Sequence, residues 1–428
     1  MLISIAISIV LVLYTICIII ASILSKKARL WVKGRWGQFD KLKKTFKDNE
    51  RPIWVHCASL GEYEQARPLI EKIKQDYPDI SILVTFYSPS GYENRKNDPL
   101  PDHIFYLPQD TKNNSRRFLS IVQPRMAIFV KYEFWFNYID QLDKRNIPFF
   151  YVCSIFRPNQ YFFKIYGKWF AKQLRKCSFF FVQNEESKRL LGQIGIHQVE
   201  VCGDTRFDRV REIARQSYEL DFVTQFKQNS KLIVAGSTWG PDEILLARLL
   251  HRIKGYKLIV APHEISRKEE VLRFFAPYKT VCFSELDTLS TVGSDGGDSI
   301  LGNNDVLVLD TIGLLSKVYK YGDVAYVGGA FRTGLHNILE AAVFGIPVFF
   351  GPKYSKFNEA VILVQEKGAF SIKNSREMAE IIHQFESDPQ YYEQTCNICG
   401  GYVEANAGAC DKICNYIFEQ HNSSIINN

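Results

Sequence analysis

The stretch "WVHCASLGEYEQARPLIEKIK", residues 54–74, joins a predicted strand to a predicted helix through a Ser-Leu-Gly turn. Trp54–Cys57 is a short apolar run typical of a buried strand, and from Ala66 onward apolar residues recur at helical spacing. Glu62 follows the turn, so it lies at the carboxyl end of a strand, where open α/β sheets bind ligands. The alternative is a capping box in which Ser59 and Glu62 only cap the helix.

The same alternation of strand and helix extends along the chain in two series. Short runs rich in β-branched and aromatic residues predict strands at 81–86, 126–132, 149–154 and 179–184, then at 231–237, 257–263, 279–285, 305–310, 323–329 and 346–351. This pattern is typical of parallel sheets wrapped by helices. We therefore predict an α/β protein with two Rossmann-like, doubly wound domains that face an interdomain cleft, where ligand would bind.

The first 24 residues suggest a membrane anchor. Residues 2–24 carry no charge, and about 20 apolar residues span a bilayer as a helix. A cleaved signal peptide would need a basic start, which is absent. Lys and Arg gather from Lys26 onward, which places that side in the cytoplasm. We expect a single-pass anchor, with the bulk of the chain on its cytoplasmic side.

The domain limits follow from these patterns. The predicted parts are a transmembrane anchor (1–25), a basic juxtamembrane segment (26–50), an N-terminal Rossmann-like domain (51–215), a C-terminal Rossmann-like domain (216–395), and a C-terminal helix packing back on the N-terminal half, with a disordered tail (396–428). The composition of the 428 residues, 46% hydrophobic and 23% charged with a net charge of +7, is that of a globular protein.

The ten cysteines are scattered, as expected for reduced thiols in the cytosol. Cys396, Cys399, Cys410 and Cys414 have a spacing that leaves a zinc site conceivable. Two glycines follow the first pair, however, and residues 402–418 have the pattern of an amphipathic helix, so packed free thiols are the favoured interpretation.

The second half contains a possible anion site. In "GGAFRTGLHNILEAAVFGIPVFFGP" a strand ends at two glycines, and a predicted helix with Asn337 and Glu340 follows. Glycine lets backbone N–H groups approach a ligand, and a helix N-terminus favours negative charge. Such an arrangement resembles the nucleotide-sugar site of the two-domain glycosyltransferase fold called GT-B.

Taken together and in order, seven segments resemble the family that transfers 3-deoxy-D-manno-octulosonic acid (Kdo) from CMP-Kdo onto the lipid A precursor. They are "ASLGEYEQARPLI", "VKYEFWFNYI", "VQNEESKRLLGQIG", "VCGDTRFD", "VAPHE", "DTIGLLSKVYKYGDVAYVGGAF" and "HNILEAAVFGIPVFFGP". The resemblance extends from about Trp31 to Phe418 and accounts for the predicted anchor, because the acceptor is a membrane lipid.

The resemblance implies roles for individual residues. Glu62 would be the general base, in a turn shaped by Ser59 and Gly61, and Glu133 and Arg206 would stabilise the transition state. The implied CMP contacts are Pro262, His263, Ile312, Gly313, Leu314, Asn337, Ile338, Leu339 and Glu340. Three features depart from the family: an Arg is missing beside His263, Ile-Gly-Leu stands where Met-Gly-Glu is usual, and the glycine loop is short.

The chemistry is consistent with these roles. A sugar hydroxyl is a poor nucleophile until a base takes its proton, and a helix N-terminus would keep Glu62 ionised. Arg206 and helix N–H groups could hold the phosphate of the departing CMP. The sequence contains no Asp-x-Asp motif, so we expect no metal and no cofactor. A single displacement inverts the anomeric centre.

Each of these residues also has a structural alternative. Glu133 could form a salt bridge to a nearby Lys or Arg, Arg206 could pair with Asp204 or Asp208, and His263 could be an ordinary loop histidine.

The predicted function is inverting, metal-independent transfer of Kdo to the glucosamine 6'-hydroxyl of lipid IVA, with CMP-Kdo, the lipid A precursor and inner-membrane lipids as partners. The alternatives are another GT-B glycosyltransferase with a different nucleotide sugar, or a catalytically inactive membrane-anchored binding protein. Nucleic acid is not expected as a partner, because the globular part has no basic stripe with interleaved aromatics. The sequence leaves the oligomeric state open.

Overall fold

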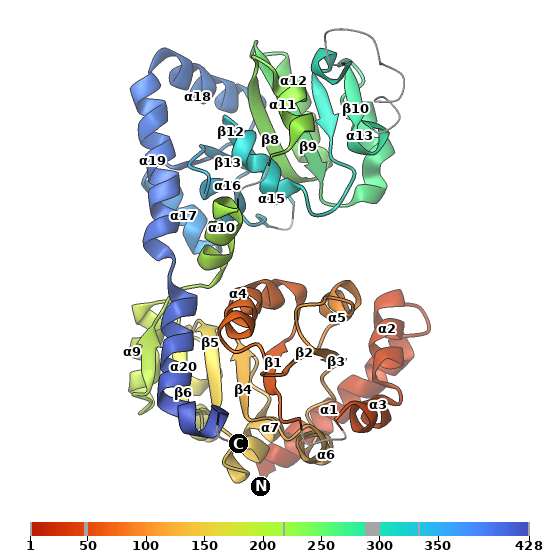
Figure 1. The fold of residues 1–428 in the computed structure, drawn as a ribbon, viewed down its shortest axis with the longest axis vertical. Helices are drawn as coiled ribbons and strands as arrows, with labels where there is room; N and C mark the ends of the chain where they lie inside the picture. The colour runs from red at the N-terminus through yellow and green to blue at the C-terminus, as the bar shows by residue number, and fades with distance from the viewer. Residues whose placement is uncertain (1, 47–49, 217–218, 287–299, 333, 427–428) are drawn as a thin grey trace. The chain divides into compact units, whose positions relative to one another are not determined.

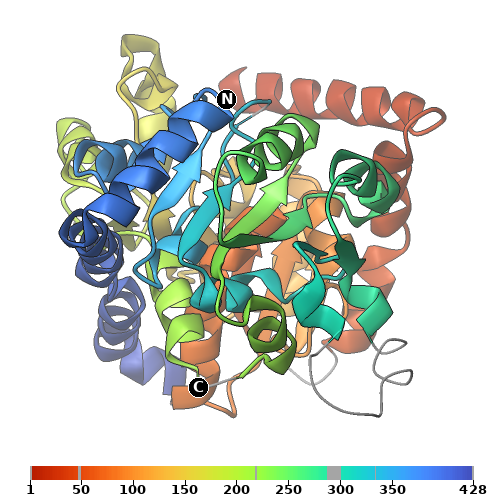
Figure 2. The ribbon, with the colours of Figure 1, turned by 90° about the horizontal axis from the view of Figure 1, so that it is seen from above.

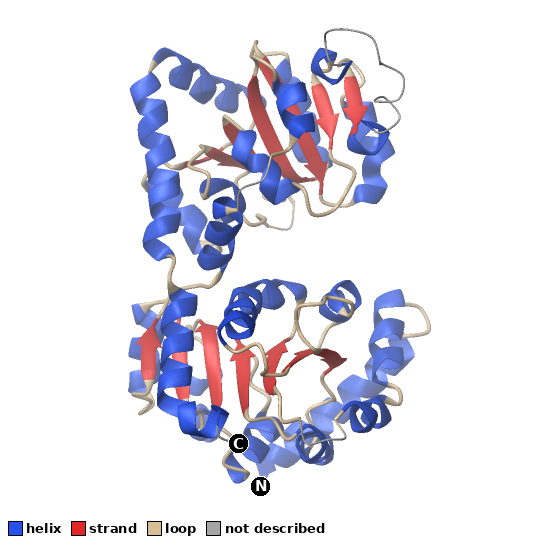
Figure 3. Ribbon diagram, in the orientation of Figure 1, coloured by secondary structure: helices blue, strands red, loops and turns tan. Residues whose placement is uncertain are grey.

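The computed structural model describes residues 2–46, 50–216, 219–286, 300–332 and 334–426. The chain divides into two compact units (Figure 1): an N-terminal unit of residues 1–209 and 407–428, and a C-terminal unit of residues 210–406. Each unit is a parallel sheet with helices on both faces (Figure 3). The predicted α/β class with two doubly wound halves is therefore confirmed.

The sheet of the N-terminal unit has the strand order β3-β2-β1-β4-β5-β6-β7. Its strands are β1 (Ile53–Cys57), β2 (Ile82–Phe86), β3 (His103–Tyr106), β4 (Met126–Val130), β5 (Phe149–Ser154), β6 (Phe179–Val182) and β7 (Val199–Val201). Neighbouring strands all pair in parallel. The sequence prediction missed β3, a short edge strand whose residues are only half-buried except for Tyr106.

The helices of this unit connect the strands and cover the sheet. They are α1 (Leu2–Ala21), α2 (Lys26–Arg35), α3 (Gln38–Thr45), α4 (Leu60–Asp76), α5 (Pro89–Arg95), α6 (Lys112–Val122), α7 (Phe136–Lys144), α8 (Lys168–Leu174), α9 (Glu185–Gln193) and α20 (Ala409–Ile426), with 3-10 turns at Tyr161–Phe163 and Ile165–Gly167. Helix α10 (Arg206–Arg215) continues from this unit into the next.

The sheet of the C-terminal unit has the strand order β10-β11-β9-β8-β12-β13-β14. Its strands are β8 (Lys231–Thr238), β9 (Tyr256–Pro262), β10 (Thr280–Cys282), β11 (Val306–Val308), β12 (Val324–Val327), β13 (Val348–Phe350) and β14 (Ala369–Ser371). These strands also pair in parallel. The three-residue edge strand β14 was not predicted, because a run that short has no readable alternation.

The helices of the C-terminal unit alternate with its strands. They are α11 (Asp221–Lys227), α12 (Gly240–Leu250), α13 (Lys268–Phe274), α15 (Leu315–Val318), α16 (Leu339–Ala342), α17 (Asn358–Gln365), α18 (Ser375–Ser387) and α19 (Pro389–Asn406), with 3-10 turns at Ile265–Arg267, Phe283–Glu285, Ile300–Asn303 and Tyr319–Tyr321.

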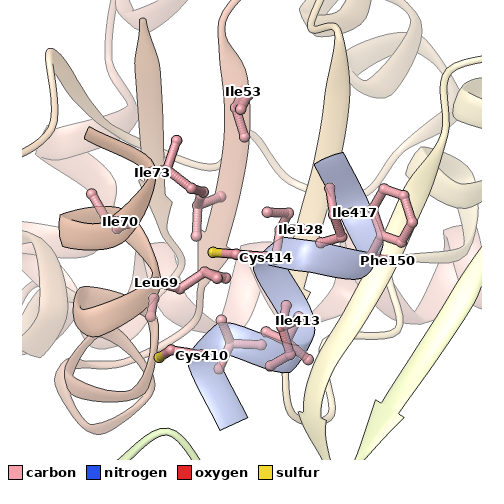
Figure 4. Packing of buried hydrophobic residues seen from close by; sticks show 14 of the residues in the cluster. Ile53, Leu69, Ile70, Ile73, Ile128, Phe150, Cys410, Ile413, Cys414 and Ile417 are labelled. Atoms are coloured by element: carbon pink, nitrogen blue, oxygen red, sulfur yellow. The ribbon is translucent and has the colours of Figure 1, made fainter. Parts of the chain in front are cut away.

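Helix α20 returns the chain to the N-terminal unit. Its apolar face packs against β1, β4, β5 and α4 (Figure 4), in a buried cluster that includes Ile413 and Ile417. The continuous helix expected over 402–418 is wrong, because Gly408, with φ of +106°, separates α19 from α20. The Asp208 carboxylate then caps α20 by accepting N–H bonds from Gly408 and Cys410. Residues 427 and 428 of the predicted disordered tail lie outside the described residues.

Helix α1 packs along the N-terminal unit and turns sharply into α2 (Figure 2). Gln109 donates its amide N–H to the Leu11 carbonyl at 2.8 Å, and the Tyr14 ring meets Trp31 edge-on. Among the described residues, no helix combines the length and the apolar character needed to cross a bilayer. The transmembrane helix predicted for residues 1–25 is therefore not supported.

The strand orders locate the ligand sites. The chain leaves two neighbouring strands in opposite directions between β1 and β4 in the N-terminal unit and between β8 and β12 in the C-terminal unit. Open α/β sheets bind ligands beyond the carboxyl ends of the strands at such switch points. The loops after these four strands therefore define the candidate site in each unit.

Candidate active site

Glu62 lies in the first turn of α4, directly after β1, as predicted. Its Oε2 accepts the Ser59 N–H at 3.0 Å, so the capping arrangement is also present. A cap does not require burial, yet Glu62 is partly buried. Gly61 is exposed and has open space where a side chain would project, so close packing does not explain that glycine.

The electrostatics of Glu62 differ from the sequence expectation. Burial, together with repulsion from the Glu133 carboxylate, raises the pKa of Glu62 from its ordinary 4.5 to about 7. The N–H groups of Ser59 and Ala58 and the Lys131 ammonium oppose this shift but do not cancel it. The helix N-terminus was expected to keep Glu62 ionised, whereas a carboxylate with a pKa of about 7 is only partly ionised at neutral pH. The result is a carboxylate suited to general base catalysis near neutral pH.

Glu133 follows β4, on the other side of the switch point. Its Oε2 accepts the Trp135 indole N–H at 2.8 Å and lies 3.3 Å from Nε2 of His56, which is fully buried in β1. Among the described residues, the basic side chain that contacts this carboxylate is thus a histidine, not the Lys or Arg of the structural alternative. Glu133 contacts β1 through His56, and Glu62 lies just after the same strand, so both predicted carboxylates lie at this switch point.

Lys131 is a residue that sequence reasoning missed. It is the first residue after β4 and has φ of +62°, an uncommon backbone conformation for a side chain that is not glycine. Its ammonium favours the ionised forms of both Glu62 and Asp204, so it lies near both carboxylates. Backbone strain of this kind concentrates at functional sites, although no sequence signal marked the residue.

Arg206 begins α10, after β7, and is paired with Asp204. Its guanidinium and its backbone N–H reach the Asp204 carboxylate at 2.9 to 3.0 Å. Asp204 is buried and also accepts the amide N–H groups of Gln65 and Gln183. Burial alone would raise the pKa of Asp204, but Arg206 and these hydrogen bonds hold it below the ordinary value. The pairing proposed as the structural alternative therefore exists, and it fixes the Arg206 guanidinium at the carboxyl edge of the sheet.

Replacing Arg206 with Ala is expected to lower the free energy of unfolding of the N-terminal unit by about 1–3 kcal/mol, because Asp204 keeps a buried charge that loses its main partner. Thermal denaturation at pH 7 measures the change. The double variant Asp204→Asn/Arg206→Ala is the control, and it should recover part of the loss because no buried charge remains. Equal destabilisation by the single and double variants would contradict the importance of this pair.

The C-terminal unit gathers aromatic and imidazole rings at its own switch point. Trp239 follows β8, His263 follows β9 and His336 follows β12. The His263 and His336 rings stack at 4.3 Å, and the Trp239 N–H donates to His336 Nε2 at 3.3 Å. Burial, with a smaller effect of His263, lowers the pKa of His336 to about 4. The three rings thus form one cluster, in which the His336 imidazole is neutral at pH 7.

The glycines of the predicted anion site are sterically required. A side chain at Gly328 would lie 2.4 Å from the Ser237 carbonyl oxygen, and Gly329 has φ of +94°. The Gly329 N–H donates to the buried Asp242 carboxylate at 3.1 Å, so this N–H serves the loop itself. Two guanidinium groups border the rings, with Arg332 4.5 Å and Arg267 5.6 Å from the Trp239 ring centre.

The other predicted CMP contacts differ in accessibility. Ile312 and Gly313 are exposed, whereas Leu314 is half-buried just before α15, and Pro262 is buried as the last residue of β9. Further along, the side chains of Ile338 and Leu339 are buried in the core. Asn337 donates to the Glu340 carboxylate at 3.0 Å. Helix α16 has a single turn, much shorter than the predicted helix with Asn337 inside it.

The four C-terminal cysteines are divided between the units. Cys396 and Cys399 belong to α19, and the Cys399 thiol donates to the Gly368 carbonyl. Cys410 and Cys414 belong to α20 and pack in the N-terminal core. Within the described part of the chain, no three His, Cys, Asp or Glu side chains are grouped as a metal site would require.

Comparisons of the sequence relate this chain to known proteins. A family model described as 3-deoxy-D-manno-octulosonic-acid transferase (Kdo transferase) matches residues 32–209. The 3-deoxy-D-manno-octulosonic acid transferase of Haemophilus influenzae is 30% identical over 343 residues, 77% of this chain and 77% of that relative. A bifunctional glycosyltransferase/methyltransferase of Fusobacterium nucleatum is 26% identical over 87% of this chain, which spans 58% of that longer relative.

The fold is also found in solved structures. UDP-GlcNAc 2-epimerase from Neisseria meningitidis, bound to UDP-GlcNAc, has a TM-score of 0.59 at 14% identity, covering 86% of this chain and all of that one. The two parallel-sheet α/β units of this protein are those of the GT-B fold class. Similarity to the Haemophilus influenzae enzyme over most of both chains makes this more specific. The chain belongs to the 3-deoxy-D-manno-octulosonic acid (Kdo) transferase family.

Proposed function

We propose that this protein transfers Kdo from CMP-Kdo to the glucosamine 6'-hydroxyl of lipid IVA, the lipid A precursor, with inversion and without a metal ion. The observation that carries this proposal is Glu62, a carboxylate with a pKa of about 7 at a switch point of the sheet, in a chain of the Kdo transferase family. A base with this pKa is partly ionised at neutral pH and still basic enough to accept a hydroxyl proton.

In the N-terminal unit, the Glu62 carboxylate takes the proton from the acceptor hydroxyl as that oxygen attacks the anomeric carbon of Kdo. The bond from that carbon to the CMP phosphate breaks, and CMP leaves with the bonding electrons. Positive charge develops on the sugar as it passes between the two oxygens, and the Glu133 carboxylate is placed to stabilise it. The Arg206 guanidinium, which Asp204 holds in place, stabilises the negative charge of the leaving phosphate.

In the C-terminal unit, the cluster formed by the rings of Trp239, His263 and His336 is suited to bind an aromatic base or a ribose. The guanidinium of Arg332, next to Trp239, is suited to bind a phosphate. Arg332 thereby supplies a guanidinium over Trp239, whose ring lies beside His263, the residue next to which the arginine usual in the family is missing from the sequence. We assign Arg332 to the CMP phosphate for this reason.

Transfer from freshly generated CMP-Kdo to a tetra-acylated lipid A precursor tests the function. We expect product with the full chain, unaffected by EDTA, and protection against thermal unfolding by CMP but not by UDP. Protection by UDP without Kdo transfer would favour another GT-B glycosyltransferase. Specific binding of CMP and acceptor by a folded protein that forms no product would favour the inactive binding protein.

We also propose that α1 and α2 contact the membrane that carries the acceptor. Large apolar side chains of α1 and its C-terminal end are exposed: Val10, Val12, Leu13, Ile16, Ile19, Ile20, Ile23 and Leu24. The neighbouring α2 exposes basic side chains at its start, including Lys26 and Lys27. Apolar side chains beside lysines favour contact with an anionic lipid surface.

Flotation with vesicles containing anionic lipid tests this contact. The double variant Leu13→Ser/Ile20→Ser should weaken vesicle binding by about 10- to 100-fold, because two exposed apolar side chains are lost from the contact. Binding of the wild type should also weaken as salt rises. Ile244→Ser, an exposed apolar residue in the C-terminal unit, is the matched control and should bind normally. Unchanged binding by the double variant would contradict the proposal.

A further inference from the structure

A chain of buried hydrogen bonds lies beneath Glu133. Trp54 and His56 point to the same face of β1, and His56 is in register with Thr85 of β2. Trp54 Nε1 is 2.7 Å from Thr85 Oγ1, which is 2.8 Å from His56 Nδ1. His56 Nε2 is 3.3 Å from Glu133 Oε2. Trp54, His56 and Thr85 are all fully buried, so water does not compete for these contacts.

The direction of each bond follows from chemistry. An indole N–H can only donate, so Thr85 Oγ1 accepts from Trp54. A carboxylate can only accept, so the His56 nitrogen that faces Glu133 must carry a proton. The Thr85 hydroxyl proton is then available to His56 Nδ1, so the polar side-chain atoms of Trp54, Thr85 and His56 all have partners. The arrangement selects the tautomer of His56 that is protonated on Nε2.

The effect on Glu133 is to orient its carboxylate. Both N–H donors, from His56 and from Trp135, meet the same oxygen, Oε2. Among the described residues, Oε1 has no hydrogen-bond donor, which leaves this oxygen for a ligand. A carboxylate held by two fixed donors loses little freedom when the transition state forms.

We propose that His56 is a positioning residue for Glu133, with its tautomer fixed by the Thr85 hydroxyl. It keeps Oε2 engaged so that Oε1 is directed to the reacting sugar. The role of Glu133 in this inference rests on the proposed function, but the tautomer and the hydrogen-bond chain do not. Neither His56 nor Thr85 touches substrate; they act through Glu133.

Matched variants at each position separate positioning from packing. In His56→Gln the amide nitrogen can replace Nε2 and donate to Glu133, whereas the shorter His56→Asn reaches only towards Thr85. Thr85→Ser keeps the hydroxyl, and Thr85→Val removes it at nearly equal volume. We expect His56→Asn and Thr85→Val to lose about 10- to 100-fold in kcat with KM within about twofold, and His56→Gln and Thr85→Ser to stay within about threefold of wild-type kcat.

Nitrogen NMR of the full chain, labelled with 15N-histidine, reads the tautomer without any substrate. The chain has 8 histidines, and the signal absent from His56→Gln identifies His56. We expect a proton on Nε2 and a lone pair on Nδ1 in the wild type. A proton on Nδ1, or on both nitrogens, would overturn the proposal, as would equal kcat values for His56→Asn and His56→Gln. If the wild type shows the expected tautomer but transfers no Kdo, the proposed function fails and the assigned hydrogen-bond chain stands.

Discussion

Replacing Glu62 with Gln reduces the rate of Kdo transfer by about 10²- to 10⁴-fold, with both substrates still bound. Gln keeps the size of the side chain and an oxygen that can accept the Ser59 N–H, so the start of α4 is preserved. The variant loses only the ability to take a proton, and general base catalysis typically contributes a factor of this size. Transfer assays with a tetra-acylated acceptor, with kcat and KM measured separately, check this result.

The pH dependence of the wild type should show the same group. Glu62 must be ionised to act as a base, and its pKa is about 7, so kcat should rise with pH through about 7. Glu62→Gln should abolish this rise of kcat with pH. The matched control is Glu64→Gln, which removes an exposed carboxylate from the same helix and should leave transfer unchanged.

Stability provides a second readout with a definite sign. The folded-state pKa of Glu62 lies above its ordinary 4.5, so the folded state binds this proton more tightly than the unfolded state. The ionised carboxylate therefore costs stability, increasingly from pH 4.5 to about 7 and fully above that. Glu62→Gln should raise Tm relative to wild type at pH 8 but not at pH 4.5. Undiminished transfer by this variant would make Glu62 a helix cap only.

Replacing Glu133 with Gln should lower kcat by about 10²- to 10³-fold, the effect expected when a charge aimed at the transition state is removed. After burial, the Glu133 carboxylate is the largest cause of the raised pKa of Glu62. Its removal should therefore lower the pKa of Glu62 below about 7 and shift the activity profile towards acid. The residual activity of the variant, measured from pH 5 to 8 (roughly the range around these pKa values), checks both effects.

Asp143→Asn is the control for this second variant. Asp143 lies in α7, pairs with Lys176 at 3.2 Å and is well exposed, so removing its charge should change neither kcat nor the pH profile. A fall in kcat for Glu133→Gln without an acid shift would mean that Glu133 and Glu62 do not interact as the geometry indicates. An acid shift with full kcat would remove Glu133 from the catalytic step.

The sequence predicted much of the fold because the buried strands are strongly apolar. Strands such as β4 and β8, with five or more buried residues in a row, leave a clear pattern. Edge strands β3 and β14 leave no such pattern in the sequence, because they are short and only partly buried. The break between α19 and α20 was missed as well, since an isolated Gly408 within an amphipathic pattern does not by itself reveal its positive φ.

The residues of the candidate site also divide into those that the sequence could identify and those that it could not. Glu62, Glu133 and Arg206 could be named from the sequence, because each sits in a distinctive segment that resembles the family. His56 and Lys131 could not be assigned roles, because their importance depends on neighbours distant in the sequence. Asp204 could be named only as a possible partner of Arg206, and its burial beside Gln65 appears only in the folded chain.

The sequence by itself determined the class of fold, the order of its elements and the positions of the two carboxylates after their strands. Local periodicity and the resemblance of ordered segments were enough, since both are properties of the chain read in one dimension. Only the tertiary structure decided the raised pKa of Glu62, the pairing of Arg206 with Asp204 and the path of α1 along the N-terminal unit. Burial and charge coupling depend on distances through space, and the chain fixes those only when it folds.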